Sequence, residues 1–351
     1  MSENGNVNSE VYACNGCGGP TGFDPKSQNL KCEYCGHTTE IEVEEVEIKS
    51  YCLNDGIEEC DTNWQEETKV LHCDNCGADS VLCGTTKAQV CPFCDSSHVR
   101  DIAEDAGIKP ELMIPFKVSR DDARESFKKW IKGKFFAHND AKDAKRVDAL
   151  AGVYVPFWLY DVDTHTQYTG SRGRRVRSRS SRRGNSSRIR WKRVSGEYDK
   201  SFRDFPVCAS SRISDEDLSE KKLDFNYNEL TTYSPAYLAG FTAERYEQDL
   251  ESAWVKAKKA MEKVIRRGVK RDIGGDKQRI HSMDVNYSEP KYKHVLCPMW
   301  VSVFKYQDKE YPFIVNGQTG EVEGKYPLSY PKIAGVVAGV VALISLYYFY
   351  V

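Results

Sequence analysis

The sequence of 351 residues predicts an α+β fold with a mostly antiparallel sheet, preceded by two tandem four-cysteine modules and followed by one C-terminal transmembrane helix. Three observations support this prediction. Cys-x-x-Cys pairs recur at a fixed spacing near the N-terminus. Alternating and helical apolar patterns share the region 109–328. The last nineteen residues, 333–351, contain no charged side chain.

One four-cysteine module occurs twice. Each cysteine of the second set lies 59 positions after its counterpart in the first, so the module is duplicated. A Cys-x-x-Cys turn directs two thiolates inward, and two such turns close a tetrahedral site around Zn²⁺. The sequence therefore predicts two zinc ribbons, one in 1–48 and one in 49–108 after a spacer, with two Zn²⁺ ions as cofactors. The predicted metal ligands are Cys14, Cys17, Cys32, Cys35, Cys73, Cys76, Cys91 and Cys94.

The residues that follow the cysteine pairs favour tight turns. Gly18, Gly36 and Gly77 each follow the second cysteine of a pair, where a positive φ is often needed, and Asp95 takes that place in the fourth pair. A thioredoxin-like redox pair and the disulfides of a secreted protein are the alternatives, but neither explains the fixed spacing. The remaining cysteines are interpreted as small hydrophobes or bystanders; they are Cys52, Cys60, Cys83, Cys208 and Cys297.

Charge is divided unequally along the chain. The formal net charge is −2, but residues 1–108 hold 21 acidic and 6 basic side chains, a net of −15, which leaves +13 for the rest. Because nucleic-acid backbones are bound mainly by Lys and Arg, the acidic modules are poorly suited to that role. The first ten residues contain no apolar run, so we expect no secretory signal peptide and a reducing compartment for the thiols.

The region 109–328 is expected to form the α+β domain. A helix should begin after Ser119, which caps it together with Asp122, and end at Gly133. A second helix is expected over about 243–267, before the pair Gly274-Gly275. The strand patterns occupy about 153–169, 189–205, 278–289, 293–306 and 310–323, with hairpin turns at 307–309 and 316–317.

Shorter signals complete this pattern. Pro115, Pro156 and Pro298 lie in similar apolar phrases, and because proline lacks the N–H that a central strand needs, each is expected at a strand start or edge. The aromatic side chains of the domain are expected to fill its core. Ahead of the domain, 38–50 alternates apolar and acidic residues like a half-exposed strand, and 51–68 is interpreted as an irregular spacer.

The segment 171–193 contains ten arginines, one lysine and no acid. Ser and Gly fill the gaps, so we expect the centre of the segment to be a flexible insertion between two strands and not an amphipathic helix. Its candidate ligands are anionic lipid, an acidic protein surface (the cysteine modules included) and nucleic acid, and a merely solvated loop is the alternative. The candidate contact residues are Arg172, Arg174, Arg175, Arg177, Arg179, Arg182, Arg183, Arg188 and Arg190.

The apolar segment 333–351 is long enough to cross a bilayer, because a helix of this length spans about 28 Å. Tyrosines flank both ends like aromatic belts, and Lys325 and Lys332 precede the segment. We therefore expect 329–351 to form a single-pass tail anchor in the cell membrane, with the bulk of the chain cytoplasmic; a buried core helix is the alternative. Gly335 and Gly339 form a small-xxx-small face on which another membrane helix would pack.

Four stretches outside the cysteine pairs form a recognisable pattern: IPFKVSRDDARESFKKWIKGKFF, YVPFWLYDVD, SPAYLAGFTAERYE and LCPMWVSVFKYQDKEYPFIVNGQTGEVEGKYP. With the Cys-x-x-Cys turns they resemble, over nearly the whole chain, a bacterial (mainly Firmicute) family of TFIIB-type zinc-ribbon membrane proteins, sometimes labelled primosomal helicase-like. Genes of that family commonly neighbour those of a flotillin-like SPFH protein and phage-shock protein A. The resemblance implies a membrane adaptor in envelope-stress response, with those two proteins as candidate partners.

The leading hypothesis from the sequence is a non-enzymatic membrane adaptor whose zinc ribbons bind partner proteins. The alternative is a membrane-tethered nucleic-acid binder that uses the arginine-rich segment, and a third hypothesis is a thiol redox enzyme with free, low-pKa thiols. Hydrolase and helicase chemistry is not expected. Four-thiolate sites leave no open coordination position, and the sequence contains neither HExxH nor a nucleotide-binding GxxxxGK[ST] loop.

Overall fold

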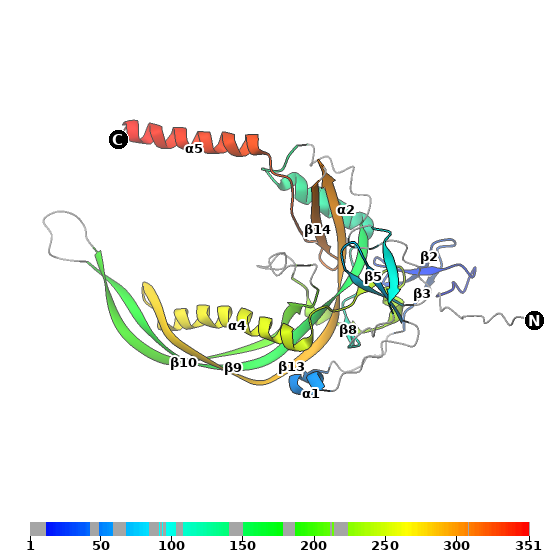
Figure 1. Ribbon diagram of the computed structural model, residues 1–351, viewed down its shortest axis with the longest axis horizontal. Coiled ribbons are helices and arrows are strands. Elements are labelled where there is room, and N and C mark those ends of the chain that lie inside the picture. The colour runs from blue at the N-terminus through cyan, green and yellow to red at the C-terminus, as the bar shows by residue number, and fades with distance from the viewer. Residues whose placement is uncertain are drawn as a thin grey trace, which may run out of the picture.

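The structure is a computed structural model. It describes residues 12–42, 49–58, 68–83, 91, 93, 96–102, 108–139, 150–177, 187–210, 213, 224–307 and 309–350. The described chain has a body that contains the cysteine modules, a long curved arm of β-structure, and a C-terminal helix that stands clear of both (Figure 1). The predicted α+β class with a mostly antiparallel sheet is confirmed.

Two long strands form the centre of the main sheet. β9 (Ala151–Arg177) pairs antiparallel with β13 (Lys277–Tyr306) along almost its whole length, and β10 (Ser187–Cys208) pairs with the other edge of β9. The parts 162–177, 187–202 and 277–288 of these strands extend from the body, and we call them the arm (Figure 1). The predicted separation of 278–289 from 293–306 is wrong, because a β-bulge between Ser288 and Lys291 bends one continuous strand instead of ending it.

A buried charge cluster lies where the arm leaves the body. Both outer strands have a bulge there, and each bulge contains a non-glycine residue with positive φ, Asp204 at 49° and Glu289 at 45°. The Lys293 ammonium is 3.2 Å from a carboxylate oxygen of Asp161 and also contacts Asp204, and the Asp204 amide donates to Asp161 over 2.8 Å. These bonds hold the bend between arm and body.

Shorter strands complete the sheet in the body. β8 (Leu112–Met113) runs parallel to β13 and pairs with β11 (Thr231–Thr232), while β14 (Lys309–Asn316) and β15 (Val322–Gly324) extend the other end of β13. The predicted turn at 307–309 is therefore confirmed. β12 (Thr242–Glu244) runs parallel to β9, and two single 3₁₀ turns, η2 (Tyr227–Glu229) and η3 (Pro235–Leu238), connect these strands.

Pro156 and Pro298 lie inside long central strands, so the prediction of strand starts or edges is wrong for both. At Pro156 the neighbouring strand changes from β10, whose pairing ends at Phe157, to β12, whose pairing begins at Tyr154. At Pro298 it changes from β8 to β14. Each proline carbonyl still accepts one bond there, from the Ala209 or Gly317 amide. A missing N–H is tolerated because each proline pairs only on the β9–β13 side, and on its other edge it lies between two successive partner strands.

Two helices cover the sheet. α2 (Arg120–Gly133) begins where predicted, since the Ser119 hydroxyl accepts from the Asp122 amide over 3.3 Å, and it packs against β14 and β15. α4 (Leu250–Ile273) lies along the arm (Figure 1). The prediction of 243–267 is about two turns too early, because 242–244 is a strand and the cap is Asp249. The predicted core role of the aromatics is confirmed by stacked pairs such as Phe127 and Phe313.

Both cysteine modules contact the body. The first forms a separate sheet of β1 (Thr21–Asp24), β2 (Asn29–Cys32) and β3 (Thr38–Thr39), yet its Phe23 is buried in the same core as Tyr154. The second contributes β5 (Thr68–Cys73), β6 (Asp79–Cys83) and β7 (Val99–Ile102), and β6 pairs with β12 of the main sheet. Contacts thus cross the predicted boundaries at residues 48 and 108.

The segment between the modules is more ordered than predicted. β4 (Tyr51–Cys52) pairs with β13, and α1 (Leu53–Glu58) buries Leu53 against Tyr292, so the beginning of the supposed irregular spacer is structured. Of the predicted strand 38–50, the described part is strand only in β3.

α5 (Tyr330–Tyr350) lies within the predicted anchor 329–351, begins three residues before its apolar run, and buries none of its side chains. Among the described residues it is the one helix long and apolar enough to cross a membrane. Figure 1 shows α5 and the arm extending from the body toward the same side.

Candidate metal centres and a basic arm

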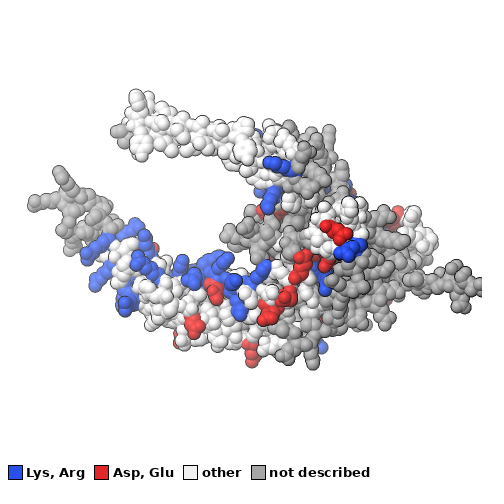
Figure 2. Space-filling view, in the orientation of Figure 1, with Lys and Arg blue, Asp and Glu red and all other residues white. Residues whose placement is uncertain are grey.

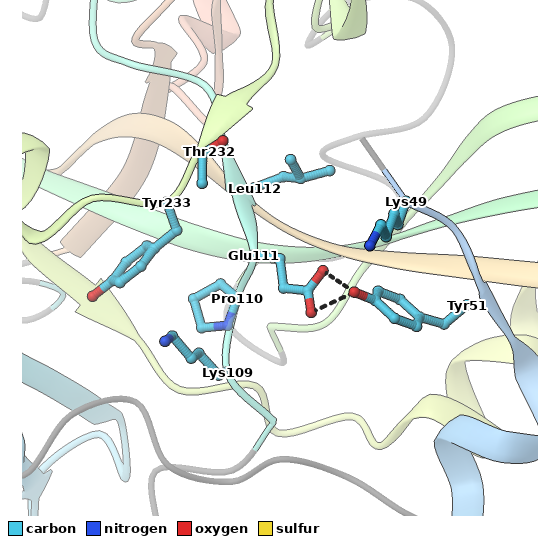
Figure 3. A pocket seen from close by; sticks show the side chains of 8 residues that line it. All are labelled: Lys49, Tyr51, Lys109, Pro110, Glu111, Leu112, Thr232 and Tyr233. Carbon is cyan, nitrogen blue, oxygen red and sulfur yellow. Dashed lines mark hydrogen bonds between the residues drawn. The ribbon is translucent and has the colours of Figure 1, made fainter. Parts of the chain in front are cut away.

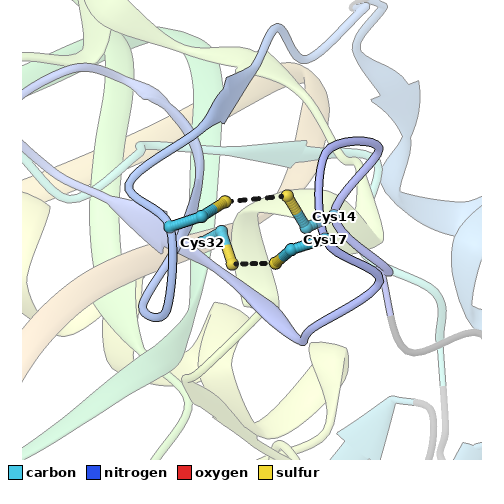
Figure 4. A group of neighbouring side chains, drawn as sticks. Cys14, Cys17 and Cys32 are labelled. Carbon is cyan, nitrogen blue, oxygen red and sulfur yellow. Dashed lines mark hydrogen bonds between the residues drawn. The ribbon is translucent and has the colours of Figure 1, made fainter.

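The first cysteine cluster has the geometry of a four-sulfur metal site. All four sulfurs of Cys14, Cys17, Cys32 and Cys35 lie within 4.8 Å of one another. Cys14 and Cys35 are 3.4 Å apart and Cys17 and Cys32 are 3.5 Å apart, and Figure 4 shows the Cys17 and Cys32 sulfurs pointing toward each other. Zn–S bonds of about 2.3 Å in a tetrahedron place sulfurs roughly 3.8 Å apart, so the four side chains fit a metal ion of this kind.

Backbone hydrogen bonds form the same turn at every cysteine pair. The amide of the first cysteine donates to the carbonyl five residues on, over 2.7 Å at Cys14, 2.9 Å at Cys32 and Cys73, and 2.8 Å at Cys91. Gly18, Gly36 and Gly77 have φ between 71° and 74°, as the sequence predicted, and their amides donate to the first cysteine's carbonyl. The positive φ favours glycine here, because a Cβ would strain the backbone.

The local backbone also changes the acidity of the thiols. The Gly16 amide donates to the Cys14 sulfur over 3.3 Å and lowers the pKa of Cys14, and the Cys35 amide does the same for Cys32, whose pKa is about 7. The Cys35 pKa is about 12, because hydrogen bonds to the other thiols raise it more than the His37 amide lowers it. Repulsion between neighbouring thiolates therefore keeps the four crowded thiols from all losing their protons, and a bound cation would offset this repulsion.

The second cluster is described at three of its four predicted ligands. The sulfurs of Cys73, Cys76 and Cys91 lie within 4.8 Å of one another, with 3.6 Å between Cys76 and Cys91. Cys94 and Asp95 lie outside the described residues. Three buried or half-buried thiols could hold a metal ion, and Ala78 and Phe93 pack beside them.

Outside the clusters, the described cysteines behave differently from one another. Cys208 and Cys297 are buried in the sheet core, as expected of small hydrophobes, whereas Cys52 is exposed. The side chains of Cys60 and Cys83 lie outside the described residues.

The arginine-rich segment forms much of the arm. The predicted strand over 189–205 is confirmed, because 187–193 pairs with 171–177 and places Arg190 opposite Arg174 and Lys192 opposite Arg172. The preceding strand was expected to end near 169 but continues to residue 177, and the centre of the predicted insertion, 178–186, lies outside the described residues. Gly173 is buried opposite Trp191 and lies against Ile189, so small and apolar residues between the charges give the two strands a surface on which to pack. Arg179, Arg182, Arg183 and the side chain of Arg177 lie outside the described residues.

Basic side chains are concentrated at the distal end of the arm (Figure 2). Arg174, Arg188, Arg190 and Lys192 are exposed there. Arg172 differs from them, because its Nε donates to the Ile273 carbonyl at the end of α4. It is a helix-capping residue as well as a charge, which the sequence pattern did not reveal.

Sequence reasoning missed the basic residues that come from other elements. Lys270 and Arg271 occupy the last turn of α4, and Lys277 and Arg279 begin β13. The Arg279 guanidinium lies 4.3 Å above the centre of the Trp191 ring. These residues are more than 75 positions from 171–193 in the sequence. The pairing of β13 with β9 places Lys277 opposite Gly173 and Arg279 opposite Ser171, and α4 packs along the same strands.

Comparisons with known proteins give one informative match. No protein-family model matches the sequence, and no solved structure matches it. The uncharacterized protein YdjG of Bacillus subtilis (strain 168) is 30% identical over 343 residues, which cover 94% of this chain and 93% of YdjG. The chain belongs to the YdjG family. The two proteins therefore match as whole chains and not through a shared module alone.

A separate cavity of about 250 Å³ lies between β4, β8 and β11 (Figure 3). Its lining side chains are Lys49, Tyr51, Lys109, Pro110, Glu111, Leu112, Thr232 and Tyr233. The Tyr51 hydroxyl donates to both Glu111 oxygens, over 2.8 and 2.6 Å, and burial together with this carboxylate raises the pKa of Tyr51 to about 12. The pair joins β4 to β8, and we assign it a structural role at the edge of the sheet.

Proposed function

We propose that this chain is a non-enzymatic, membrane-anchored zinc-ribbon adaptor that binds partner proteins at the cytoplasmic face of the cell membrane. Each ribbon would hold one Zn²⁺ through its four cysteines, and α5 would cross the bilayer once. The observation that supports the proposal best is the set of four sulfurs within 4.8 Å, in the same chain as a helix able to span a membrane.

Several features favour a structural rather than a chemical role for the metal. Four thiolates fill the tetrahedral positions of Zn²⁺ and leave none for a substrate or an activated water. The modules would instead present a fixed acidic surface, since residues 1–108 carry the net negative charge of the chain. By the family resemblance given above, the candidate partners are a flotillin-like SPFH protein and phage-shock protein A, in envelope-stress response.

Affinity purification from detergent-solubilised membranes tests the adaptor role. We compare the parent chain with a Cys14→Ser, Cys17→Ser variant, which loses the first predicted zinc site but keeps α5. Partner proteins should co-purify with the parent and be lost from the variant, while both chains remain in the membrane fraction. Recovery of the same proteins from both would contradict a role of the first module in partner binding.

Protease protection tests the sidedness. Lys325 and Lys332 precede α5, and positive residues favour the cytoplasmic side. Trypsin should cleave the body in inverted membrane vesicles and leave it intact in whole protoplasts. Cleavage in protoplasts would place the body outside the cell.

A nucleic-acid binder remains the second candidate, because Arg279 and Trp191 offer a cation and an aromatic ring on one surface of a basic arm. Aromatic stacking and Arg contacts are the usual means of holding single-stranded nucleic acid. Salt-dependent retention of single-stranded RNA that is lost on Trp191→Ala would favour this candidate, and absence of retention at low salt would eliminate it.

A further inference from the structure

A turn that follows α2 is bonded to the chain where α5 begins. The His138 amide donates to the Pro327 carbonyl over 3.0 Å, and the Ser329 amide donates to the Phe136 carbonyl over 2.8 Å. The Lys332 ammonium, in the first turn of α5, donates to the Ala137 carbonyl over 2.9 Å. Residues almost 200 positions apart are therefore fixed side by side at the base of the helix.

This base exposes large apolar side chains. Phe135 is 64% exposed and Tyr330 is 78% exposed, and Leu328, which is bridged to Ala137, is 47% exposed. Phe135 contacts the Phe136 ring edge to face at 5.1 Å, so part of its ring is packed while the rest faces outward. Water-exposed rings of this size are costly at a site with no apolar partner.

The two segments that form this base carry only positive charges. Residues 128–139 and 325–332 contain no Asp or Glu. Their lysines are Lys128, Lys129, Lys132, Lys134, Lys325 and Lys332. Lys134 lies 4.8 Å from the centre of the Trp130 ring, and Trp130 packs edge to face on Tyr326, so this lysine and the start of α5 share one aromatic cluster. We call Lys132, Lys134, Phe135, Leu328 and Tyr330 the collar.

We propose that the collar is a second membrane-binding element, in which Phe135 enters the interfacial region of the bilayer and the lysines contact anionic lipid headgroups. This inference rests on the proposed function, because it requires α5 to cross a bilayer. The backbone pairing at 327–329 keeps the collar within a few residues of the membrane entry point, whichever direction α5 takes. Aromatic rings and lysines together are the residue types that favour this depth.

Spin-label accessibility in the full-length chain tests the proposal. A ketone-bearing amino acid replaces Phe135, Val340 or Val255, one position at a time, and carries a nitroxide, which leaves all cysteines untouched. Val340 lies on α5, and Val255 is an exposed residue of α4 that serves as the aqueous control. Each protein is placed in nanodiscs of either anionic or zwitterionic phospholipid. Collisions with oxygen report lipid, and collisions with a nickel chelate report water.

In anionic nanodiscs the labels at 135 and 340 should both collide more with oxygen than with the nickel chelate. The label at 255 should collide more with the nickel chelate. In zwitterionic nanodiscs the label at 135 should become at least twofold more accessible to nickel. If the label at 340 favours oxygen while the label at 135 favours the nickel chelate, as the label at 255 does, the collar proposal is wrong and the membrane anchor is still supported. If 340 is also exposed to nickel, the anchor itself is wrong. Equal nickel accessibility at 135 in both lipids would overturn the role of the lysines.

Discussion

Lys293 is a residue on which the bend between body and arm depends. Its ammonium is largely buried between Asp161 and Asp204, so replacing it with Met leaves two carboxylates without their cation. Breaking such a buried pair typically costs about 3–5 kcal/mol. We expect Lys293→Met to lower the free energy of unfolding by about that amount in urea denaturation, and Lys277→Met, at an exposed position, to have little effect. Equal effects of the two changes would contradict this role.

Acid should weaken the same cluster. Although burial raises it, the pKa of Asp161 is below its usual value of 3.8, because the Asp204 amide and Lys293 stabilise the carboxylate. A lowered folded pKa stabilises the fold fully above the unfolded pKa, and this stabilisation is lost as the pH falls through the folded value. Between pH 5 and pH 3, Asp161→Asn should therefore lose less of its own stability than the parent does. Parallel losses in the two proteins would show that Asp161 does not contribute.

Single cysteines allow the two metal sites to be counted. We expect two zinc ions in the parent chain and one in Cys32→Ser, because a structural site does not survive the loss of one thiolate. Cys52→Ser is the matched control, since Cys52 is exposed and outside both clusters, and it should retain two. Elemental analysis of protein purified without chelator decides the matter, and one zinc or none in the parent would contradict the proposed sites.

Gly268 controls how closely α4 approaches the arm. A Cβ at this position would overlap the Tyr198 ring, whereas a Cβ on Gly133, at the end of α2, would meet nothing within 4 Å. Overpacking typically costs about 1–3 kcal/mol, more than the roughly 1 kcal/mol that Ala gains over Gly in a helix. We expect Gly268→Ala to lower the melting temperature and Gly133→Ala to leave it unchanged or raise it. Differential scanning calorimetry measures both.

Exposed arginines of the arm should bind anions through charge alone. Arg174, Arg190 and Lys192 are the residues to replace with Gln, and Arg172 is left in place because it caps α4. In a chain ending at Pro331, the triple change should reduce binding to anionic vesicles severalfold, and binding should fall steeply with salt. Lys259→Gln, Lys263→Gln and Lys291→Gln form the control. RNA is tested beside the vesicles, and binding that ignores both salt and substitutions would exclude the arm as an anion-binding surface.

Local signals explain which elements could be predicted from sequence. The cysteine turns and α2 depend on neighbouring residues, such as Gly18 with its positive φ and Ser119 with Asp122, so reading them needs no tertiary information. The predicted start of α4 is too early because the apolar stripe continues back to Tyr246. Residues 242–244 pair with two other strands, and the helix therefore begins only after its N-cap Asp249. Sequence periodicity cannot register such long-range competition.

Long-range contacts also explain what was missed at the candidate sites. The sequence shows the arginines of 171–193 as one run, but in the paired strands their side chains have different surroundings. Arg172 bonds to the end of α4, whereas Arg174 is exposed to solvent. The collar could not be predicted from the sequence for the same reason. The Ala137–Leu328 bridge brings the segment that contains Phe135 to the start of α5. The cysteine clusters were predictable because the spacing of their Cys-x-x-Cys pairs repeats.

The parallel course of α5 and the arm restricts how the whole molecule can dock on a membrane. A bilayer perpendicular to α5 would be met by the arm as well, because both extend to the same side (Figure 1). Charged side chains at the bilayer centre cost about 2.5–3.5 kcal/mol each on insertion scales, so the arm with its exposed arginines must stay outside. If α5 crosses a bilayer, it would have to turn away from the arm at a joint after residue 329, where the Lys332 bonds to Ala137 and Asn139 would be given up. The chain would then have two arrangements, one in water with α5 beside the arm and one in a membrane with α5 turned away from it. The arm would lie along the lipid headgroups only after α5 has entered the bilayer.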